Sequence, residues 1–115
     1  MENPNLNLES LIVAHYKNVS EEMGYIVKPD ESQINNFGYT TMNKSQFSRA
    51  ENLFKLNIAN YPESANCYDS MGDLYLAKGD KVKAVENFKK ALTLKDIPET
   101  KEKLEQLLKT KKIDN

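Results

Sequence analysis

The sequence contains few of the residues from which catalytic and metal centres are usually built. Its 115 residues include one histidine, one cysteine and no tryptophan. A single cysteine cannot form an internal disulfide, and one histidine with one distant cysteine is too small a ligand set for a zinc site. None of the four glycines belongs to a G-x-S-x-G nucleophile elbow. We therefore expect no enzyme activity, no cofactor and no bound metal.

Charge of one sign and long apolar runs are also missing. Sixteen basic and seventeen acidic residues leave a formal net charge of −1, which argues against a nucleic-acid partner. The longest apolar runs are a few residues and fall short of a membrane span. The first residues lack the basic and apolar regions of a signal peptide. We expect a single cytoplasmic domain, exported only if the chain is a piece of a secreted protein.

The few reactive side chains each have a simpler interpretation. His15 would need a partnered nucleophile or base to act in catalysis, and a structural or exposed histidine is the commoner case. Cys67 falls in the first turn of a predicted helix, where the helix dipole could lower its pKa. A buried cysteine that only packs is the more frequent alternative.

An internal repeat is the strongest feature of the sequence. When the chain is shifted by 34 residues, two glycines, two alanines and two phenylalanines coincide. These pairs are Gly38 with Gly72, Ala50 with Ala84, and Phe54 with Phe88. Glycine inside a helix costs about 1 kcal/mol relative to alanine, so its recurrence predicts two helices that approach closely. The alanines are expected to allow the same approach from the facing helix.

The repeat resembles the tetratricopeptide-repeat (TPR) family over residues 31–97. The first copy reads Ile34-x-x-Phe37-Gly38-x-x-Thr41, then Ala50-x-x-x-Phe54, and ends near Pro62. The second reads Tyr68-x-x-Met71-Gly72-x-x-Tyr75, then Ala84-x-x-x-Phe88. The resemblance implies an all-α fold, a right-handed solenoid of two helix-turn-helix repeats. Two positions depart from the family pattern, which has a small residue at Asn57 and a tyrosine at Thr41.

Apolar spacing and helix-capping residues predict six helices, over residues 8–23, 31–43, 47–60, 65–77, 81–94 and 98–111. They divide the chain into an N-terminal helix and linker (1–30), two repeats (31–64 and 65–97) and a C-terminal capping helix with a tail (98–115). Expected N-terminal caps are Asn7, Asp30, Ser45, Ser64, Asp80 and Asp96. Two repeats are few for a stable stack, so the terminal helices must help to close it or pack on something else.

The family resemblance also implies a function and a site. TPR domains bind protein segments in a concave groove lined by the first helix of each pair. In this register the groove residues are Asn35, Tyr39, Met42, Asn66, Asp69 and Asp73, with Ser32 and Asn36 beside them. We expect a non-catalytic module that binds a protein or peptide, with a basic residue accepted at the two aspartates. The groove lacks the basic residues of TPR domains that bind chaperone C-termini.

A second resemblance covers most of the chain from Leu8 onward. The stretch from His15 to Ser20, then Met23-Gly24-Tyr25 and Pro29, is similar to the linker of certain bacterial serine esterases of the α/β-hydrolase fold. The run from Tyr61 to Gly72 is also similar to theirs. This implies an alternative function, a C-terminal accessory segment of an esterase whose catalytic domain is absent here. A homodimer through the terminal helices is a further possibility.

Overall fold

The computed structural model describes residues 8–24 and 27–113, and these residues form six α-helices without any strand. The helices are α1 (Leu8–Met23), α2 (Glu31–Asn43), α3 (Phe47–Asn60), α4 (Ala65–Ala77), α5 (Lys81–Leu94) and α6 (Pro98–Ile113). The predicted all-α class and helix bounds are confirmed, except that α6 runs two residues further than expected. The proposed N-cap of α1, Asn7, lies outside the described residues.

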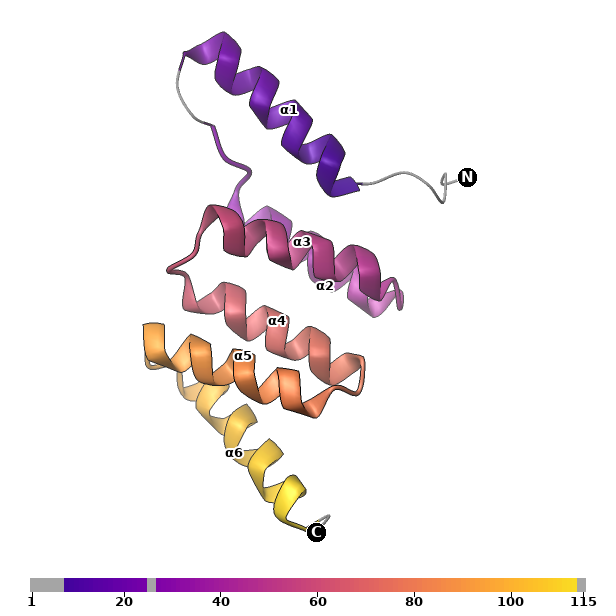
Figure 1. Ribbon diagram of the computed structural model, residues 1–115, viewed down its shortest axis with the longest axis vertical. Coiled ribbons are helices and arrows are strands. Elements are labelled where there is room, and N and C mark those ends of the chain that lie inside the picture. Colours follow the sequence, from indigo (N-terminus) through magenta and orange to yellow (C-terminus); the bar gives the residue numbers. More distant parts are fainter. Residues whose placement is uncertain (1–7, 25–26, 114–115) are drawn as a thin grey trace.

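The helices stack in chain order into a thin, elongated molecule of 55 × 35 × 16 Å. Helices α2 and α3 form one antiparallel pair and α4 and α5 form the next (Figure 1). Helix α1 lies at one end of the stack and α6 at the other. Helix α4 packs on α3, and α6 packs on α5 to the same extent, so α6 occupies the position that the first helix of a third pair would have.

Each of the two central pairs is held by a contact between a glycine and a phenylalanine ring. A Cβ atom added to Gly38 would overlap the ring of Phe54, and one added to Gly72 would overlap the ring of Phe88. Both rings are buried and belong to a core that also contains Met71, Leu74 and Tyr75. The predicted close approach of the paired helices is confirmed, and the rings are what a larger side chain would displace.

The equivalent position in helix α6 is not a glycine, and no phenylalanine ring of a following helix packs against it in the described residues. Thirty-four residues after Gly72 the chain has Gln106, an exposed residue of α6. In the described part of the chain no further helix follows α6, so no phenylalanine ring presses on this position. A longer side chain that favours helix is therefore tolerated there.

Of the predicted caps, Asp30 and Asp80 are confirmed, Ser64 holds the cap position without a side-chain bond, and Ser45 is wrong. The side chain of Asp30 accepts a hydrogen bond from the Gln33 amide, and that of Asp80 accepts one from Lys83. Helix α3 starts after Gln46, because Ser45 adopts a positive φ of 62° in the turn. Ser64 precedes α4 but makes no side-chain cap, since its hydroxyl donates to Glu31 Oε2 at 2.6 Å.

Asn57 is the polar residue at a position where the second pair has Ala91. It is 1% exposed, and its Nδ2 donates to the carbonyl oxygen of Glu31 at 3.0 Å. Among the described residues no donor reaches its Oδ1. The hydrogen bond stabilises the fold and the unsatisfied acceptor destabilises it. Each effect changes the free energy of unfolding by about 1 kcal/mol or somewhat more, in opposite directions.

We therefore expect Asn57→Ala to change the free energy of unfolding by less than about 1 kcal/mol. Leu53 is equally buried at 1% exposure, and Leu53→Ala should cost about 2–4 kcal/mol because only packing is lost. Urea unfolding of both variants measures the difference. Equal losses at the two positions would contradict the proposed balance at Asn57.

Helix α1 is attached less closely than the other helices. It packs against α3, and the hydroxyl of Ser20 accepts a hydrogen bond from the Val27 amide at 2.6 Å. Its apolar residues Leu11, Val13 and Met23 are each about half exposed. None of the helices described here is both long and apolar enough to cross a membrane.

Candidate partner-binding face

Helices α2, α4 and α6 are the first helices of successive pairs, and we call the surface they share the first-helix face. Polar side chains join them to one another. Tyr39 of α2 donates its hydroxyl to Asp73 Oδ2 of α4 at 2.5 Å. Lys103 of α6 lies 3.1 Å from Asp69 Oδ2 and 3.1 Å from Asp73 Oδ1. These contacts link the three helices into one row.

Two further bonds complete this interhelical network. The hydroxyl of Thr100 donates to Asp69 Oδ1 at 2.6 Å, and that of Ser70 donates to Asn35 Oδ1. Thr100 and Ser70 are both fully buried. Part of the network is therefore buried between the helices, and it contributes to their packing.

The network follows the 34-residue register of the sequence. Tyr39 and Asp73 occupy equivalent positions on α2 and α4, and they bond to each other. Asp69 and Lys103 occupy equivalent positions on α4 and α6, and they form an ion pair. In both cases a residue bonds to the residue at the same repeat position in the first helix of the next pair.

Burial and hydrogen bonding shift the proton affinity of two members of the network. Burial, together with the hydrogen bond to Asp73, raises the pKa of Tyr39 well above its ordinary value, so it stays a hydrogen-bond donor. Burial alone would lower the pKa of Lys103, but its hydrogen bonds to Asp69 and Asp73 outweigh burial and raise it. Both groups are held in the protonated form that the two carboxylates require.

The six residues predicted for the groove fall into two groups. Asn35, Tyr39, Asp69 and Asp73 meet in the network. Met42 packs beside the core, and Asn66 lies exposed one turn before Asp69. A partner-binding role for the six stays a prediction.

Lys103 was missed in the sequence, although its offset from Asp69 could have revealed it. Its ammonium group already occupies the position that we expected a partner's basic residue to take. The side chains of Asp69 and Asp73 are only 14% and 21% exposed. A cationic partner would have to displace Lys103 before reaching either carboxylate.

The open part of the first-helix face lies mainly on α2. Ser32 and Asn36 are exposed there, and Asn36 borders a shallow hollow of about 480 Å³ with Gln33, Phe37 and Thr40. Phe37 is 50% exposed, whereas Met71, its equivalent on α4, is 3% exposed. The difference arises because the pair of α2 and α3 packs on α4 and covers Met71, whereas no helix pair precedes α2 in the described residues.

No family model, curated protein or solved structure matches this chain.

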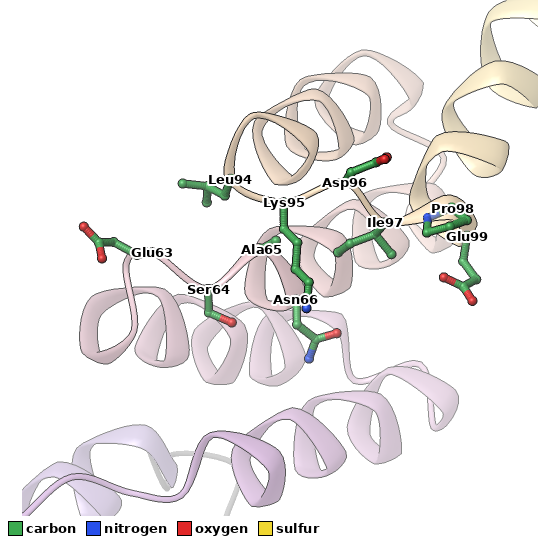
Figure 2. Close-up of a pocket in the computed structure, with 10 residues that line it drawn as sticks. All are labelled: Glu63, Ser64, Ala65, Asn66, Leu94, Lys95, Asp96, Ile97, Pro98 and Glu99. Atoms are coloured by element: carbon green, nitrogen blue, oxygen red, sulfur yellow. The ribbon is translucent and has the colours of Figure 1, made fainter.

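A second hollow of about 520 Å³ opens where two interhelical connections meet (Figure 2). One wall is formed by residues 63–66, which lead from α3 into α4 and include Asn66. The other is formed by residues 94–99, which lead from α5 into α6. Asn66 is thus a predicted groove residue that borders this hollow.

The remaining reactive side chains do not form a site in the described residues. Burial raises the pKa of Cys67 to about 11, so the thiol is protonated at neutral pH, and the buried side chain fits the packing role. Its sulfur lies 3.7 Å from Glu31 Oε2. His15 is exposed and meets the ring of Tyr16 edge-on. No group of three metal-binding side chains occurs in the part of the chain described here.

Proposed function

We propose that this chain is a TPR-type right-handed solenoid and a non-catalytic module that binds an extended segment of a partner protein along its first-helix face. The observation that carries the proposal is the repeated geometry of the two pairs. The contact of Gly38 with Phe54 recurs as that of Gly72 with Phe88, 34 residues later. A repeat of this length with a close first-to-second helix contact is typical of TPR arrays.

The chemistry of the face suits a peptide in extended form. Ser32, Asn36 and Asn66 present exposed hydroxyl and amide groups, which can donate to and accept from a peptide backbone. Phe37, which lies at the end of the stack that a preceding pair would cover, adds one exposed apolar side chain next to Asn36. Because Lys103 already pairs with both Asp69 and Asp73, we assign binding to this exposed polar row and the structural role to the network.

Affinity capture with surface variants tests the proposal. Changing Asn35, Tyr39, Asp69 and Asp73 would disturb helix packing as well as binding, so those positions make poor probes. We would replace Ser32 and Asn36 with arginine and use the chain as bait in lysate from its own source. Ser48→Arg with Thr93→Arg, at exposed positions of α3 and α5, is the matched control.

We expect a reproducible partner that is retained by the original chain and by the control. Its recovery should fall by about tenfold or more with the α2 variant, because two bulky charged side chains would obstruct the face. Equal recovery by both variants would place binding elsewhere and overturn the proposal.

The accessory segment of a serine esterase is the second candidate, and the exposure of α1 favours it. Leu11, Val13 and Met23 are each about half exposed, which suits a helix that packs on a domain outside this chain. Captured proteins can be treated with a fluorophosphonate that labels active serine hydrolases. A labelled protein held through α1, and lost with Leu11→Asp and Val13→Asp, would support this candidate, whereas an unlabelled capture would exclude it.

A further inference from the structure

The described chain contains two equivalent junctions between successive first helices, and an aromatic side chain, Tyr61, lies at the first but not at the second. At the first junction Tyr61 is half buried, and its hydroxyl donates to the carbonyl oxygen of Pro29 at 2.7 Å. Beside it, the hydroxyl of Ser64 donates to Glu31 Oε2 at 2.6 Å. These two bonds close the space between the chain entering α2 and the chain entering α4.

The same positions, 34 residues later, line the 520 Å³ hollow of Figure 2. Lys95 stands in the place of Tyr61 and Glu63 in that of Pro29. Pro98 stands in the place of Ser64, and Ala65 in that of Glu31. Pro98 has no hydroxyl and Ala65 no carboxylate, so the second closing bond cannot form. The aromatic ring that fills the first junction is missing as well.

The walls of the hollow are suited to an aromatic ring and its rim to positive charge. Ala65, Leu94 and Ile97 supply apolar surface, while Glu63, Asp96 and Glu99 supply three carboxylates against the single ammonium group of Lys95. In Figure 2 Glu63 and Glu99 stand at opposite ends of the hollow, and the side chain of Lys95 extends between them toward Asn66. A volume of several hundred Å³ is in the range of ligand pockets.

We propose that this hollow is a socket for a tyrosine side chain of a partner segment whose neighbouring residues are basic. We base the choice of tyrosine on Tyr61 at the first junction. Its hydroxyl donates to the carbonyl of Pro29, which leads into α2, and the equivalent carbonyl at the second junction belongs to Glu63. The ammonium group of Lys28 lies 5.6 Å from the centre of the Tyr61 ring. A lysine can therefore lie beside a tyrosine ring at a junction of this kind. The proposal rests on the proposed function, because it names the chemistry of one residue of the bound segment.

Two probes separate the aromatic contribution from the charged one. The first is a capped Lys-Tyr-Lys tripeptide and the second is p-cresol, which is the tyrosine side chain alone. Titration of the full chain followed by amide NMR should shift the signals of Ala65, Asn66, Ile97 and Glu99 with either probe. The absence of shifts at these amides with both probes would overturn the proposal.

Lys95→Tyr is the decisive variant, because it should fill the second junction as Tyr61 fills the first. We expect binding of both probes to weaken about tenfold or more and the melting temperature to rise. Lys89→Tyr, at an exposed position of α5, is the matched control and should leave binding unchanged. Tripeptide binding that is the same in Lys95→Tyr and the original chain would also contradict the socket.

A charge variant completes the test without filling the hollow. Glu63→Gln with Glu99→Gln should weaken the tripeptide several-fold and leave p-cresol unaffected, since only the tripeptide is cationic. Loss of both ligands equally would show that the rim does not select charge. Capture through Ser32 and Asn36 is measured separately, so a failed socket with partner capture retained overturns this inference alone.

Discussion

Replacing Gly72 by alanine is expected to destabilise this protein by about 2–3 kcal/mol. In an exposed helix the same change stabilises by about 1 kcal/mol, because alanine favours helix more than glycine. Here the added methyl group would overlap the ring of Phe88, which is fully buried in the core. The ring cannot move without disturbing Met71 and Ala84 beside it, so the steric cost exceeds the gain in helix propensity.

Two controls isolate the steric cause. Gln106→Ala changes the equivalent position of α6, where no ring is present, and should alter the free energy of unfolding by less than about 0.5 kcal/mol. Phe88→Leu removes the ring edge, so Gly72→Ala should cost clearly less in that background than in the original chain. Additive effects of Gly72→Ala and Phe88→Leu in urea unfolding would show that the contact does not limit residue 72.

Replacing Lys103 by methionine should cost about 2 kcal/mol. The change keeps most of the side-chain length but leaves Asp69 and Asp73 without a cation. Both carboxylates are mostly buried, and Lys103 is one-third exposed, so water screens part of the loss. Lys101→Met, at an exposed position of α6, is the control and should be nearly neutral.

The Lys103 interaction should also depend on pH in a defined direction. Hydrogen bonds to Asp69 and Asp73 raise the pKa of Lys103 above its ordinary 10.5. A raised lysine pKa means that the folded state binds the proton more tightly than the unfolded state. The stabilisation is therefore complete below pH 10.5 and declines as the pH rises through the folded-state pKa. The cost of Lys103→Met should be constant from pH 7 to about 10 and smaller above, and a cost that grew with alkali would contradict this assignment.

The sequence alone predicted the helices because their signals are local and repeated. Apolar spacing, Pro62 and Gly79 mark the boundaries, and the recurrence of Gly38 at Gly72 fixes the register. Ser45 is not a cap because it adopts a positive φ in the turn, whereas Ser64 holds the cap position without a side-chain bond to the helix. Ser64 prefers a carboxylate from another helix, Glu31, and such a partner cannot be read from neighbouring residues.

The candidate site was only partly predictable for the same reason. Helical register placed Asn35, Tyr39, Asp69 and Asp73 on one face, and the structure brings them together. Register does not say whether polar side chains on a face turn to solvent or to the adjacent helix. Lys103 adds its ammonium group from α6, so both aspartates have a partner within the fold.

The second junction could not be predicted from the sequence, because its difference from the first depends on contacts between helices. Tyr61 and Lys95 are equivalent by the 34-residue repeat, but the sequence does not show that Tyr61 lies between two interhelical connections. The hydrogen bond from Tyr61 to Pro29 identifies that role, and the hollow beside Lys95 shows its loss.

Site-specific photo-crosslinking tests the central claim, partner binding by the first-helix face, most directly. A benzoylphenylalanine would replace Asn36 on α2 in one variant and Thr93 on α5 in the other, and each would be irradiated in lysate from the protein's own source. We expect one covalent partner from Asn36 and background labelling from Thr93. Crosslinks of equal yield from the two positions, or a product from Thr93 alone, would contradict binding along the first-helix face.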